Sequence, residues 1–198
     1  MENTNYPDGW VKEILETEFV KPSTRALLLD RLDTNTKSTP DFFDDESFSI
    51  LQCVCMRLIP QDRNEPIDLA GLLDEQLSKS PGNGWRYDEL PEDKVLFKKG
   101  IKGMEKLAQM AFAKTFCDLD DAETDQILLT IQAGNAKGYE WDQIPSNLFF
   151  EELLASLVEL YYSHPLAKEE IGDISFADAK GWKNIGLDQI EKPNPNNR

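Results

Sequence analysis

The chain has 198 residues, enough for one domain with a substantial core. Its 21 Lys and Arg against 37 Asp and Glu give a formal net charge of −16, a balance that repels nucleic-acid phosphates and anionic lipid headgroups. We therefore expect no nucleic-acid partner. The negative charge suits solubility or a basic partner. No apolar run approaches the roughly 18 residues of a membrane helix, so direct membrane insertion is not expected.

Helical periodicity runs through the chain, and no alternating strand pattern of useful length interrupts it. Turn residues and Pro separate the helical stretches. The expected helices are, in chain order, 9–20, 22–33, 44–59, 67–79, 91–117, 120–134 and 146–163. The pattern predicts an all-α fold, a compact bundle of about five to seven helices with an irregular C-terminal tail.

Two local features refine these helices. Asp120 and Glu123 form an Asp-x-x-Glu pattern, typical of a capping box at a helix start. Gly100 and Gly103, inside the helix expected at 91–117, allow either a close helix contact or a bend.

The cysteines give little sign of chemistry. Three is an odd and low count, which does not suggest a disulfide scaffold. Cys53 and Cys55 fall on one helix, roughly 200° apart around its axis, and so cannot bind one metal together. We expect both to be buried small apolar residues.

The sequence carries none of the common catalytic or metal motifs, so no catalytic, cofactor-binding or metal-binding residue is predicted in this chain. Its only histidine, His164, stands between a helix end and Pro165. There a histidine commonly caps backbone carbonyls and interacts with the helix dipole. Structural capping or a partner contact is therefore the favoured interpretation, and catalysis is the weaker alternative.

Aromatic residues at the end of the last expected helix, in the loops and in the tail are the candidate partner contacts. For Tyr161, Tyr162 and Trp182, core packing and a partner interface remain equal alternatives. Trp85 and Tyr87 lie in a loop with Gly and Pro, and for them a partner interface is slightly favoured. The full set of predicted partner-binding residues is Tyr161, Tyr162, His164, Pro165, Trp182, Gly186, Trp85 and Tyr87.

An ordered series of motifs points to a family. They are Phe42-Phe43-Asp44-Asp45, Arg57-Leu58-Ile59-Pro60, Leu73-Asp74, a long helix through Gly100, Ile101 and Leu107, Phe116-x-x-Leu119, Ile127-Leu128-Leu129, Phe149-Phe150, Tyr161-Tyr162-Ser163-His164-Pro165 and Gly181-Trp182-Lys183-x-Ile185-Gly186. In this order and spacing, about residues 41–188 resemble the gluconate 2-dehydrogenase subunit 3 family. On this resemblance, 1–40 is an N-terminal helical extension, 41–188 the family domain and 189–198 a polar tail.

The resemblance implies a small helical subunit that accompanies FAD-dependent sugar and alcohol dehydrogenases of the glucose-methanol-choline type. Such a subunit has no active site of its own. It binds the large flavoprotein subunit, helps it mature and often carries the twin-arginine signal that exports the pair. FAD is then expected in the partner and not in this chain, with electrons passing to a cytochrome subunit or another acceptor.

Two departures from the family pattern affect these expectations. No export signal is visible at the N-terminus, so we expect a periplasmic location if the partner carries the signal and a cytoplasmic one otherwise. The Gly-Gly-Asn of many members is replaced by the segment 166–180, which leaves the details of the tail contact open. The alternatives are a stand-alone helical interaction module and, less favoured, an enzyme that uses His164.

Overall fold

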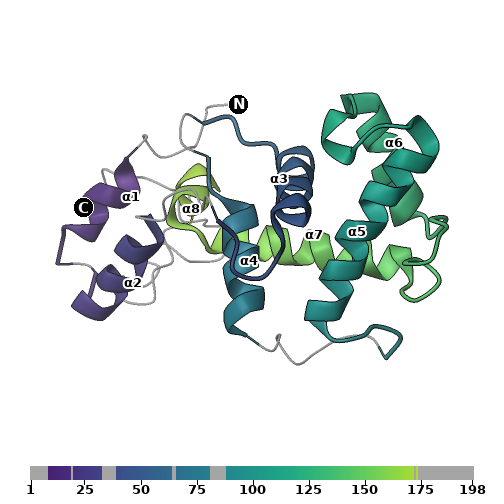
Figure 1. The fold of residues 1–198 in the computed structure, drawn as a ribbon. Coiled ribbons are helices and arrows are strands. Elements are labelled where there is room, and N and C mark those ends of the chain that lie inside the picture. Colours follow the sequence, from purple (N-terminus) through teal and green to yellow (C-terminus); the bar gives the residue numbers. More distant parts are fainter. Residues whose placement is uncertain are drawn as a thin grey trace, which may run out of the picture. The chain divides into compact units, whose positions relative to one another are not determined.

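The computed structural model describes residues 9–18, 20–32, 39–63, 66–80, 88–171 and 173 (Figure 1). Within these residues the chain is all-α and has no strand, which confirms the predicted fold class. The elements are α1 (Trp10–Leu15), α2 (Pro22–Leu32), α3 (Asp45–Leu58), α4 (Leu69–Lys79), α5 (Asp93–Phe112), η1 (Phe116–Asp118, a 3-10 helix), α6 (Asp121–Gln132), α7 (Ser146–Ser163) and α8 (Pro165–Ile171).

Eight α-helices among the described residues exceed the expected five to seven, and the addition is α8. The expected irregular tail directly after α7 is wrong for residues 165–171, which form α8. Pro165 is the first residue of this helix, a position where its missing N–H costs nothing. The rest of the tail, from residue 174 onwards, lies outside the described residues.

The helix expected at 91–117 is shorter than predicted. It ends at Phe112, because Ala113 adopts a left-handed conformation with φ 55° and its N–H bonds to the Gln109 carbonyl. After this turn, η1 buries Phe116 before α6 begins. No Gly or Pro marks the break, so the sequence pattern alone did not reveal it.

The predicted behaviour of Cys53 was wrong as well. Its sulfur is bonded to that of Cys117, across 64 residues, so a disulfide joins α3 to η1. Cys55 is buried with a free thiol, as expected. Helical periodicity places residues on a face but says nothing of which distant segment meets that face, so the pairing was not predictable.

Backbone contacts divide the chain into two compact units, one of residues 1–35 with 161–198 and one of residues 36–160. The division expected from the sequence separates 1–40 from 41–188. In the structure, α1 and α2 share a small core with α8: the buried Val11, Leu15, Val20 and Leu28, with Leu166 packed against them. The helices α1 and α2 thus pack on α8.

The larger unit, 36–160, is organised around close contacts of α5. Gly100 faces the ring of the fully buried Phe149 on α7, and Gly103 faces the indole of Trp141. The rings of Trp141 and Phe149 lie 5.6 Å apart. The contact between Gly100 and α7 confirms the close helix contact, one of the two predicted alternatives, whereas Gly103 packs against a residue of the turn before α7.

Helix starts in this unit follow local rules. Asp120 and Glu123 form both hydrogen bonds of the predicted capping box, and Asp44 accepts the N–H of Ser47 at the start of α3. The loop before α3 is held differently. The carboxylate of the fully buried Asp74 accepts three successive backbone N–H groups, from Asp41, Phe42 and Phe43.

Candidate partner-binding sites

His164, the residue between α7 and α8, is buried, with 4% of its surface exposed. Its Nε2 lies 2.8 Å from the carbonyl oxygen of Arg31, at the end of α2, and its Nδ1 lies 3.3 Å from the backbone nitrogen of Leu166. A carbonyl only accepts and a backbone N–H only donates, so these contacts fit a neutral ring with the proton on Nε2. His164 therefore caps a helix end, that of α2 rather than that of the helix it follows, and both ring nitrogens are engaged.

Arg31 completes a reciprocal connection between two helix ends. Its Nη1 donates to the carbonyl of Ser163, the last residue of α7, at 2.8 Å. His164 in turn donates to the carbonyl of Arg31. The last carbonyls of a helix lack partners within the helix. Arg31, near the end of α2, thus caps the end of α7, and His164, which follows α7, caps the end of α2.

The two tyrosines of the helix end differ in exposure. Tyr161 is buried, and its hydroxyl donates to the carboxylate of Glu170 in α8. Tyr162 is 45% exposed, with its ring edge-on to that of Tyr161 at 5.1 Å. Pro165 is buried at the start of α8. Of the four predicted contacts in this stretch, Tyr162 is the one whose side chain is exposed.

Glu169 in α8 was not singled out from the sequence. Its carboxylate is buried and accepts two backbone N–H groups at the start of α1, from Gly9 at 2.9 Å and from Val11 at 2.7 Å. Gly9 has no side chain to cap this helix, so the cap comes from a residue 160 positions later. No local pattern predicts a cap at that distance.

The other predicted partner contacts cannot be placed. Trp85, Tyr87, Trp182 and Gly186 lie outside the described residues. Their role in partner binding stays a prediction.

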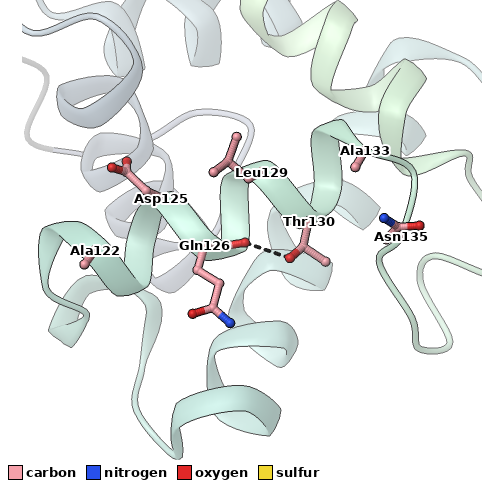
Figure 2. A pocket seen from close by; sticks show the side chains of 7 residues that line it. All are labelled: Ala122, Asp125, Gln126, Leu129, Thr130, Ala133 and Asn135. Atoms are coloured by element: carbon pink, nitrogen blue, oxygen red, sulfur yellow. Dashed lines mark hydrogen bonds between the residues drawn. The ribbon is translucent and has the colours of Figure 1, made fainter.

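A shallow hollow lies along the outer side of α6, and sequence reasoning missed it. Figure 2 shows its side chains, with the Thr130 hydroxyl bonded to the Gln126 carbonyl. Leu129 is the large apolar residue here and is 61% exposed. Three consecutive apolar residues, 127–129, cannot all face inward on a helix, which was the available sign. The lining residues are Ala122, Asp125, Gln126, Leu129, Thr130, Ala133 and Asn135.

At one end of this hollow, Asp125 is held by an ion pair. Arg57 on α3 donates to both carboxylate oxygens of Asp125, at 2.7 and 2.6 Å, and also lies 3.0 Å from a carboxylate oxygen of Asp121. The hydrogen bonds from Arg57 lower the pKa of Asp125. The pair thus remains charged, with a planar two-point geometry.

Comparison with known families gives one match. Residues 45–188 match the family model described as gluconate 2-dehydrogenase subunit 3. The chain belongs to this family. No curated protein and no solved structure matches it. The match begins at the first residue of α3 and includes α8, so α1 and α2 lie outside it. The family name describes a subunit of an oxidoreductase complex and suggests an accessory role.

Among the residues that the structure describes, no group of three or more His, Cys, Asp or Glu side chains could hold a metal ion. No helix in this part of the chain is both long and apolar enough to cross a membrane.

Proposed function

We propose that this protein is a non-catalytic accessory subunit of an FAD-dependent sugar or alcohol dehydrogenase of the glucose-methanol-choline type. It binds the large flavoprotein subunit and supports its maturation. FAD resides in that partner, which passes electrons to a cytochrome subunit or another acceptor. The observation that carries the proposal is the family match, which spans α3 to α8 and includes the Tyr-Tyr-Ser-His-Pro helix end.

The contacts of His164 support a non-catalytic role. An acid-base residue needs a ring nitrogen that can reach a substrate. In this structure the ring is buried and both nitrogens contact backbone groups of α2 and α8. His164 is the only histidine of the chain, so the enzyme alternative loses its best candidate.

Tyr162 is the residue through which we expect the helix end to contact the partner. It is half exposed, and Tyr161 fixes its ring from one side. Aromatic anchors of this kind are enriched among residues that dominate binding energy. Tyr161, His164 and Pro165 then act by holding Tyr162 in place rather than by direct contact.

The test is a pull-down of the tagged full-length protein from its native cell. We expect a yellow eluate with a large co-purifying flavoprotein, identified by mass. Tyr162→Ala should weaken the purified complex by about 2 kcal/mol, roughly 30-fold in Kd, if Tyr162 is a hot spot. Tyr139→Ala is the matched control, because Tyr139 is 73% exposed in a loop of the other unit.

The outcomes separate the alternatives. A captured partner without flavin would favour the stand-alone interaction module. A solitary, colourless protein with activity of its own, lost by about 10²-fold in His164→Ala, would favour the enzyme. Equal affinity of the Tyr162→Ala complex would refute the contact while leaving the subunit role intact.

A further inference from the structure

The disulfide between Cys53 and Cys117 joins α3 to η1, close to the start of α6. Cys53 is in the middle of α3 and Cys117 is in η1, directly before α6, with their Cα atoms 5.8 Å apart. The bridge closes a loop that contains α4 and α5. A bond at this position restrains the part of the larger unit that lies between α3 and η1.

The two bonded cysteines differ in environment from the third. Cys117 is exposed and Cys53 is half-buried, so the bridge is within reach of a thiol-exchange catalyst. Cys55 is buried, and burial, with a smaller contribution from the charge of Asp68, raises the pKa of its thiol. The thiolate is the species that attacks a disulfide, so Cys55 does not compete for Cys117 although it lies two residues from Cys53.

We infer that this protein is oxidised after synthesis by a thiol-disulfide oxidoreductase and works in an oxidising compartment, such as the periplasm. Disulfides persist in such compartments and are rare where glutathione and thioredoxin keep thiols reduced. The two thiols lose two protons and two electrons. The disulfide of the oxidoreductase accepts both electrons and both protons and becomes a dithiol. This inference stands whether or not the partner is a flavoprotein.

Contacts other than the bridge hold the same junction. Phe116 is buried, and its N–H donates to the carboxylate of Glu105 on α5 at 2.8 Å. Arg57 on α3 pairs with Asp125 on α6. These contacts do not depend on the redox state, so the reduced protein should still fold, and both forms can be compared in one experiment.

The test counts free thiols in the full-length protein from its native cell. Cells are quenched in acid, the protein is denatured and alkylated without reductant, and its mass is measured. We expect one label, on Cys55, and three labels after prior reduction. Cys55→Ser should carry no label without reductant. Three labels in the unreduced wild-type protein would overturn the inference.

Cell fractionation tests the compartment separately. The one-label form should be recovered from the periplasmic or extracellular fraction. Recovery of the bridged form from the cytosol alone would refute the compartment and leave only the bridge. As a stability check, reductant should lower the thermal midpoint of the wild-type protein but not that of the double variant Cys53→Ser with Cys117→Ser. An equal response of both proteins would contradict a restraining role for the bridge.

Discussion

Replacing Gly100 by Ala tests the contact on which the α5–α7 packing rests. A Cβ at this position would lie 2.0, 2.2 and 2.4 Å from three ring atoms of Phe149. Ordinary contact begins at about 3.4 Å, so the ring would have to retreat by more than an ångström. Phe149 is fully buried, with Trp141 beside it and Phe97 edge-on at 6.2 Å. The ring is therefore confined by its aromatic neighbours.

Two opposing terms set the magnitude. Ala is favoured over Gly inside a helix by about 1 kcal/mol. Overpacking a dense core costs typically about 1–3 kcal/mol and occasionally more, and a clash with three atoms of a confined ring belongs at the upper end. We expect a net loss of about 1–2 kcal/mol in the free energy of unfolding.

Urea denaturation followed by circular dichroism measures this loss. Phe149→Leu, alone and combined with Gly100→Ala, provides the control, because a smaller side chain leaves room for the new methyl group. The double variant should then lose less than the sum of the single variants, as expected for residues in direct contact. An unchanged or higher stability of Gly100→Ala, or strict additivity, would refute the close-contact reasoning.

Two carboxylates give further predictions. Glu169→Gln should destabilise the start of α1 by about 1–2 kcal/mol, because the two N–H groups bond to different carboxylate oxygens and Gln has an acceptor at only one of these positions; amide hydrogen exchange at Gly9 and Val11 should become faster. The same change at the exposed Glu159 should leave these amides unaffected, and slow exchange in Glu169→Gln would count against the cap. Lys106→Met should lower stability at neutral pH. Burial alone would raise the pKa of Glu140, and the hydrogen bond from Lys106 is the largest of the contributions that hold this pKa below its ordinary value. A carboxyl group whose pKa is lowered in the folded protein stabilises the fold at pH values above the ordinary carboxyl range, and this stabilisation is lost as the pH falls through the pKa of the folded state. The loss of stability in Lys106→Met, measured by urea denaturation, should therefore become smaller on acidification. A loss that became larger would show the opposite linkage.

What the sequence predicted well was local or carried by the family pattern. The Asp120–Glu123 capping box spans three residues and is present as expected. The seven helices expected from periodicity all exist, although their ends differ. The family assignment depended on the order of many short motifs, and the family match confirms it.

The contacts that the sequence did not predict are those between distant segments of the chain. Glu169 caps a helix 160 residues earlier, and Cys53 meets Cys117 across 64 residues. Both partners of such a pair are unremarkable in their own neighbourhoods: one is a Glu in a charged helix, the other a Cys on a helix face. Only the packing of the chain decides that they meet, and one sequence gives no measure of that packing.

The burial pattern also changes how mutations at the helix end should be interpreted. His164 connects the ends of α2 and α7 and the start of α8, so its removal would loosen all three before any partner is involved. A weaker complex of His164→Ala would therefore reflect lost positioning, and would be accompanied by lower stability of α2 and α8. Tyr162 offers its exposed ring without being part of these bonds. A weaker complex of Tyr162→Ala at unchanged stability is accordingly the result that would locate a contact.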